Sequence, residues 1–143
     1  MDSFDGSGFA AGLGWCALAL IALFAATFAL ARRLGKHSVV DVTWGLGFVV
    51  VALVSALVAD GDAARRLLVL AMVAAWGGRL AWHIGRRNAG HGEDPRYEAM
   101  LAKVEPARRT AYALRMIYGL QATLILVISL PVQVSEHLSL IHI

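Results

Sequence analysis

The chain has 143 residues, of which 59% are apolar and only 16% are charged, and its formal net charge is +3. This composition excludes a disordered chain, and it differs from that of a soluble globule, in which about half of the residues are apolar and about a quarter charged. The positive charge does not indicate nucleic acid as a partner, because the sequence has neither a basic strand interleaved with aromatic residues nor a recognition helix. We therefore predict an all-α fold, a polytopic transmembrane helical bundle in a lipid bilayer.

Four segments are apolar enough to form the spans of this bundle. They cover residues 9–31, 42–59, 67–85 and 116–134, and only the third contains basic side chains, Arg79 and His83. Each segment has 18 to 23 residues, which at 1.5 Å per residue is about the thickness of a hydrocarbon core. We predict one transmembrane domain over residues 1–137, with a long loop at 86–115.

Local patterns predict how these helices begin and end. Gly35 follows two arginines and is expected to end the first helix in a left-handed conformation. Ser38 and Asp41 have the spacing of a capping box before the second apolar segment. Residues 60–62 form a tight connection, so the second and third helices should be antiparallel neighbours. Asp94-Pro95 and Glu105-Pro106 each predict a helix start within the long loop.

The distribution of Lys and Arg predicts the orientation. The first and third loops, at 32–41 and 86–115, hold ten of these residues, and the second loop holds two. Basic residues concentrate in cytoplasmic loops. We therefore expect loops 32–41 and 86–115 in the cytoplasm and the N-terminus outside.

The first group of candidate functional residues lies at the start of the second helix. His37, Asp41 and Trp44 lie close to the cytoplasmic entrance of this span. Residues 41 and 44 share one helix face, so the carboxylate and the indole should point the same way. Alternatively, Asp41 only opposes the helix dipole and Trp44 only anchors at the membrane interface.

The second group lies within the third span. Arg79, His83 and either Arg86 or Arg87 recur at steps of three or four and predict a cationic stripe along one helix face. An arginine inside a membrane segment usually faces a bundle interior or a water-filled cavity. For the two terminal arginines the alternative is snorkelling to the interface.

The third group is the polar segment that follows this span. Asn88, Glu93 and Tyr97 lie near the glycines at positions 90 and 92, which allow sharp turns or a close approach to a ligand. Glu93 and Tyr97 are side chains that can polarise a carbonyl or transfer a proton. A solvated polar loop is the alternative interpretation.

Together these groups resemble a known family. The patterns His-Ser-x-x-Asp-x-x-Trp-Gly at 37–45, Trp-Gly-x-Arg-Leu at 76–80, Arg-Asn-x-Gly-x-Gly-Glu-Asp-x-Arg-Tyr at 87–97 and Ser-Leu-Pro-Val-Gln at 129–133 are similar to those of DUF1295, a bacterial membrane family of unknown function. That family belongs to a steroid 5-alpha-reductase-like group of membrane enzymes, which use NADPH to reduce a carbon–carbon double bond conjugated to a carbonyl. The resemblance covers about residues 33–133.

The resemblance implies an oxidoreductase of the bacterial inner membrane, acting on a lipophilic, steroid-like or isoprenoid substrate with NADPH as cofactor. The chain would be the N-terminal half of that enzyme. The implied catalytic residues are Glu93, Tyr97, Asp41 and His37, the implied cofactor-binding residues are Arg79, His83, Arg86, Arg87 and Asn88, and Trp44 would contact the substrate. No metal is implied.

The sequence also departs from the family. The Gln-Glu-Leu-Pro motif of the steroid reductases and an Arg-His-Pro-Asn-Tyr-x-Gly-Glu cofactor motif do not occur in it. Residues 138–143 depart from the family pattern, and we expect them to be a non-native tail on a truncated gene product. Two alternatives therefore stay open: a membrane methyltransferase of the isoprenylcysteine type, which would use S-adenosylmethionine, and a non-catalytic small membrane subunit.

Overall fold

The computed structural model describes residues 4–138, so most of the expected tail at 138–143 lies outside the described residues. Within that range the chain is helical and contains no strand, which confirms the predicted all-α fold. Four helical stretches are long and apolar enough to cross a membrane. Three are single helices, α1 (Gly6–Leu34), α2 (Val39–Val58) and α3 (Ala63–Asn88), and the fourth runs over Pro106–His137. Three of them extend beyond the predicted apolar segment at both ends, whereas α2 begins three residues before its segment and ends one residue short of it.

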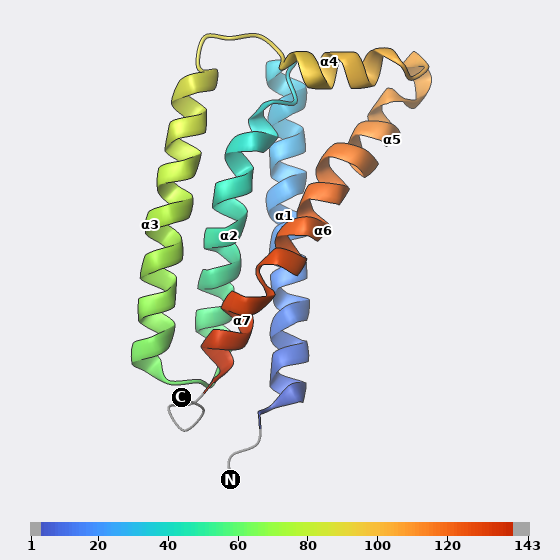
Figure 1. Cartoon of the computed structure of the whole chain (residues 1–143). Coiled ribbons are helices and arrows are strands. Elements are labelled where there is room, and N and C mark those ends of the chain that lie inside the picture. Colours follow the sequence, from blue (N-terminus) through green and yellow to red (C-terminus); the bar gives the residue numbers. More distant parts are fainter. Residues whose placement is uncertain (1–3, 139–143) are drawn as a thin grey trace.

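The fourth stretch is a series of short helical pieces. It comprises η1 (Pro106–Arg108), α5 (Arg109–Ala113), the π-helical η2 (Leu114–Gly119), α6 (Leu120–Ile128) and α7 (Leu130–His137). Ser129 ends α6 and precedes α7, whose first turn contains a proline. In Figure 1 this series descends obliquely across α1 and α2, while α4 (Pro95–Ala102) lies across one end of the bundle.

Most of the predicted helix ends are confirmed. Gly35 ends α1 with φ +70°, and its N–H bonds to the carbonyl of Ala31. The carboxylates of Asp62 and Asp94 cap α3 and α4, each accepting a backbone N–H from the first turn. The prediction of a capping box at Ser38 is wrong, because its hydroxyl makes no cap bond and is buried without a partner. A distant side chain, described below, caps α2 instead.

The antiparallel pairing of α2 with α3 is confirmed, and it depends on two glycines (Figure 1). A Cβ built on Gly45 would lie 2.5 Å from the carbonyl oxygen of Gly77, and a Cβ on Gly77 would lie 2.5 Å from that of Gly45. The two backbones therefore approach more closely than any side chain permits. On its other side α2 packs against α1, where the hydroxyls of Thr27 and Thr43 are 2.9 Å apart.

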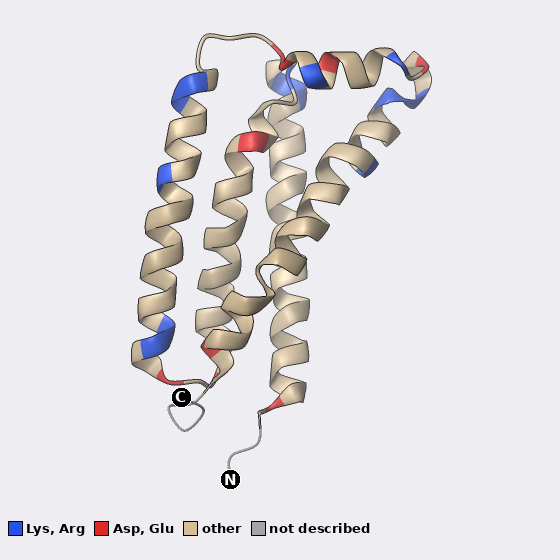
Figure 2. Cartoon of the chain, viewed as in Figure 1, with Lys and Arg blue, Asp and Glu red and all other residues tan. Residues whose placement is uncertain are grey.

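Charge separates the two ends of the bundle. Figure 2 shows that Lys and Arg gather at the end that carries α4, whereas Arg65 and Arg66 lie at the opposite end of α3. The helix α3 is at the edge of the bundle, and only Gly77 and Ala81 in it are fully buried. Most of its surface is therefore available to lipid or to a ligand.

Candidate functional site

The central contact of the candidate site joins α4 to the first turn of α2. The phenol of Tyr97 donates a hydrogen bond to Asp41 Oδ1 at 2.7 Å, although the two residues are 56 positions apart. Gln121, on α6, donates from Nε2 to the Tyr97 oxygen at 3.3 Å. Tyr97 is only 6% exposed. Three helices therefore converge on one phenolic oxygen.

An arginine accompanies this pair. Arg96 places Nη2 3.3 Å from Asp41 Oδ2 and 2.9 Å from Asp94 Oδ2. Its guanidinium carbon also lies 5.5 Å from the centroid of the Tyr97 ring. Because this guanidinium is largely exposed, solvent screens the ion pairs. Arg96 still balances part of the negative charge of Asp41.

The surroundings change the acidity of these groups in opposite directions. Burial raises the pKa of Tyr97 above its usual value, and the hydrogen bond to the Asp41 carboxylate and its negative charge raise it further. The phenol is therefore neutral at physiological pH. The side-chain hydrogen bond from Arg96 lowers the pKa of Asp94, and the backbone N–H of Arg96 contributes to the same shift.

Glu93 binds backbone rather than facing open solvent. Its Oε1 accepts the N–H of Ser38 at 2.9 Å and that of Asp94 at 2.9 Å, and its Oε2 accepts the N–H of His37. Ser38 immediately precedes α2. The carboxylate thus bonds the Ser38 N–H that a capping box would pair with Asp41, and it opposes the positive end of the helix dipole.

His37 lies next to this cap and faces a second tyrosine. Its Nδ1 shares a hydrogen bond with the Tyr118 oxygen at 2.8 Å. The Tyr118 ring is buried and packs edge-on against Phe28 of α1. His37 therefore joins the start of α2 to η2 and, through Tyr118, to α1.

A cavity of about 310 Å³ opens beside Tyr97. Its volume is at the lower end of the range for small-molecule sites. Charged and amide side chains line it together with an indole and an aliphatic chain. The lining residues are Asp41, Trp44, Ile84, Arg87, Arg96, Tyr97 and Gln121.

The predicted cationic stripe continues from Arg79 and His83 to Arg87, and Arg86 lies apart from it. Arg87 lines the cavity of Tyr97, whereas Arg86 lines a separate groove. Arg79 and His83 lie exposed beside Trp76 and Leu80, around a hollow of about 320 Å³. Leu80, His83 and Arg87 follow each other at steps of three and four, so this hollow and the cavity share one helix face.

The remaining predicted residue, Asn88, is not in the cavity. It ends α3 and lies in a hollow beside Lys36, whose Nζ donates to its backbone carbonyl at 3.5 Å. The structure thus brings together Asp41, Trp44, Arg87 and Tyr97. It places Glu93 and His37 at the adjoining cap.

Three residues of this site were missed as candidates. Arg96 counted only as a loop charge, and Tyr118 carried no signal in the sequence. Gln121 did carry one, since it is a lone amide in the first half of an apolar span, where polar side chains tend to be functional.

Comparison with known proteins gives one match. A family model described as "Protein of unknown function (DUF1295)" matches residues 27–140. This range contains every residue of the cavity and of the adjoining cap. No curated protein and no solved structure matches the chain.

Proposed function

Because the chain belongs to the DUF1295 family of proteins of unknown function, we propose that it supplies the proton-donating side of a membrane oxidoreductase. In this proposal NADPH reduces a carbon–carbon double bond conjugated to a carbonyl in a lipophilic substrate. The observation that carries it is the buried phenol of Tyr97, held between Asp41 and Gln121 at a cavity. Four apolar helices support an integral membrane location.

The cavity suits the carbonyl end of such a substrate. Trp44 and Ile84 offer apolar surface, and the phenol offers a neutral hydrogen-bond donor. A neutral donor polarises a carbonyl without requiring a buried cation, and it gives up its proton only as negative charge develops on the substrate. Tyr97 is accordingly the proposed acid.

The groups around Tyr97 hold the phenol and receive the charge that its proton leaves behind. Tyr97 gives its proton to the substrate, the phenolate oxygen that remains accepts the amide N–H of Gln121 at 3.3 Å, and water from outside the cavity returns a proton to it after the product leaves. The Asp41 carboxylate orients the phenol by accepting its O–H at 2.7 Å in the resting site, and the guanidinium of Arg96 at 3.3 Å balances the charge of that carboxylate. Glu93 acts as a positioning residue, since backbone donors occupy both of its oxygens.

The face of α3 that carries Arg87 fits an anionic cofactor. Arg87 in the cavity and the exposed Arg79 and His83 beside it are groups that bind phosphate well. When bound, NADPH would supply the hydride for the beta carbon of the substrate. A volume of about 310 Å³ holds one ring system, so the phosphates would lie along α3 outside the cavity.

Charge supports an orientation for this enzyme. Most of the Lys and Arg residues gather at the α4 end (Figure 2), and such residues concentrate on the cytoplasmic side. In the proposal the site therefore opens to the cytoplasm of a bacterial cell, where NADPH is made, and α1 begins outside.

The test is NADPH oxidation by membranes that contain the protein, with progesterone as a lipophilic enone probe. Tyr97→Phe should lower turnover by about a hundredfold and lower the free energy of unfolding by about 1.5–3 kcal/mol, because the Asp41 carboxylate loses its phenolic donor. Tyr112→Phe, on α5 away from the cavity, is the matched control. Equal turnover of the two variants, or binding of S-adenosylmethionine in place of NADPH, would overturn the proposal.

A further inference from the structure

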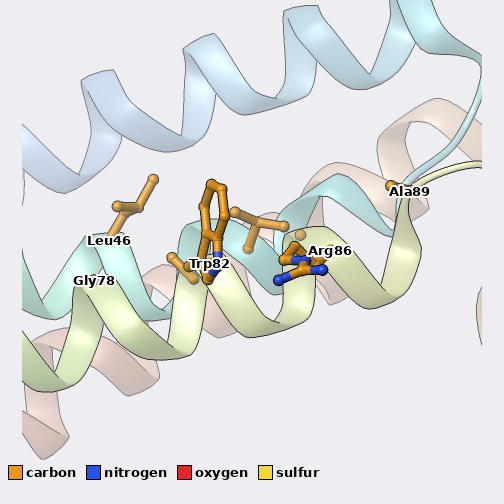
Figure 3. A pocket seen from close by; sticks show the side chains of 8 residues that line it. Leu46, Gly78, Trp82, Arg86 and Ala89 are labelled. Carbon is orange, nitrogen blue, oxygen red and sulfur yellow. The ribbon is translucent and has the colours of Figure 1, made fainter.

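A second, larger groove lies between α2 and α3 (Figure 3). Its volume is about 510 Å³, and nearly all of its lining is apolar. The wall is formed by small residues of α3, including Gly78 and Gly85, together with Val42 and Leu46 of α2. The groove exists because the glycine crossing at Gly45 holds the helices close while these small side chains leave space beside it.

Two side chains of α3 border this groove toward the α4 end. Trp82 is 68% exposed, and the guanidinium carbon of Arg86 lies 5.9 Å from the centroid of its ring. Figure 3 shows both side chains between Leu46 and Ala89. Tryptophan and arginine are residues typical of the membrane interface, where one end of a ligand is apolar and the other is hydrated.

Cationic groups are found only toward that end of the groove. A smaller hollow of about 170 Å³ adjoins it, shares Val42 and Gly85 with it, and contains Lys36. The ammonium of Lys36 donates to the carbonyl of His91 at 2.9 Å, which fixes its position without neutralising its charge. The surface therefore passes from apolar, inside the span, to positive at the end of the helix.

This polarity identifies an occupant. The acyl chain of a phospholipid lies in the apolar layer of the membrane and its phosphate lies at the interface. An anionic headgroup there complements clustered cations. We propose that the groove binds one acyl chain of an anionic phospholipid, whose headgroup contacts Arg86 and Lys36. The site is separate from the Tyr97 cavity, so it does not rest on the proposed reductase activity.

Fluorescence quenching tests this site. The full chain is reconstituted in phosphatidylcholine vesicles containing brominated phosphatidylglycerol or, in parallel, brominated phosphatidylcholine. The fluorescence of Trp82 is obtained by subtracting the fluorescence of Trp82→Phe from that of the wild type. One cation near an anionic surface corresponds to about a fivefold preference. We expect brominated phosphatidylglycerol to quench Trp82 at about fivefold lower mole fraction than brominated phosphatidylcholine.

Two pairs of variants separate the groove from general attraction to the membrane. Arg86→Gln should abolish the fivefold preference, and Arg108→Gln, in a solvated stretch of η1, should retain it. Gly78→Leu should also abolish it, because the added side chain fills the groove. A Cβ at Gly78 meets no atom within 4 Å, so the variant should fold. Gly14→Leu, equally unobstructed on α1, should retain the preference.

Several results would overturn the proposal. One is an absence of preference in the wild type, and another is an equal loss in Arg86→Gln and Arg108→Gln, which indicates diffuse attraction. A third is full preference in Gly78→Leu. If Gly78→Leu instead converts a dimer into a monomer and leaves lipid preference unchanged, the groove is occupied by a second copy through its small residues.

Discussion

Glu93→Gln is the substitution that best separates positioning from catalysis. In the wild type the carboxylate accepts three backbone N–H groups, from His37, Ser38 and Asp94. Glutamine retains one carbonyl oxygen, which can still serve two of them. Its amide nitrogen then faces the third N–H, so that two donors oppose each other, and the charge that opposes the dipole of α2 is lost.

The expected cost follows from these contacts. A hydrogen bond to a charged group contributes about 1.5–3 kcal/mol, and an unsatisfied donor costs a similar amount. Because two of the three bonds survive in neutral form, we expect the free energy of unfolding to fall by about 2–4 kcal/mol. For a chain of this size the Tm should decrease by the order of 10 °C.

Thermal unfolding in detergent, followed by helical circular dichroism, measures this change. Glu98→Gln is the matched control, because that side chain is exposed on α4, and it should shift stability by no more than about 0.5 kcal/mol. An unchanged Tm in Glu93→Gln would refute the capping role. If turnover were lost at the same time, Glu93 would be the catalytic acid that the sequence indicated.

Two further predictions concern helix packing and the phenol. Gly45→Ala places a Cβ 2.5 Å from a backbone carbonyl of α3 and should destabilise the protein by about 1–3 kcal/mol. Gly78→Ala, which meets open space, should be neutral or stabilising by up to about 1 kcal/mol, and melting curves compare the two. The pKa of Tyr97 is higher in the folded state than in the unfolded chain, where it is about 10. The stabilisation that comes from keeping this phenol neutral is therefore complete below about pH 10 and is lost as pH rises through the folded-state pKa. Phenolate absorbance should show a late-titrating group that Tyr97→Phe removes, and a titration that the variant leaves unaltered would contradict this shift.

Hydropathy was sufficient to predict the membrane helices, because a long uncharged segment has no other stable conformation in a bilayer. Helix ends were predictable where the cap is local, as at Gly35 and Asp94. Ser38 shows the limit of this reasoning. The capping spacing was present, but the Ser38 N–H that a capping box would pair with Asp41 is bonded by Glu93, 55 positions along the chain.

The cationic stripe shows a second limit. Residues 86 and 87 are neighbours in sequence, but successive residues of a helix point about 100° apart. The two arginines therefore flank the line through Arg79 and His83 on opposite sides, and spacing alone left open which of them lies at the site. The contacts of α3 with α2 and the position of α4 decide it: Arg87 lines the Tyr97 cavity, and Arg86 faces the groove on the other side.

The acid pair indicated by the sequence becomes, in the structure, two residues with different tasks. Glu93 fixes the segment before α4 to the start of α2, and the cap at Asp94 then sets the direction in which α4 begins. Tyr97 lies three residues beyond that cap, so the phenol meets Asp41 only if both attachments hold. Loss of Glu93 should therefore reduce activity by displacing α4, and loss of the Tyr97 hydroxyl should reduce activity with α4 in place. The two substitutions distinguish a proton donor from the contact that positions it.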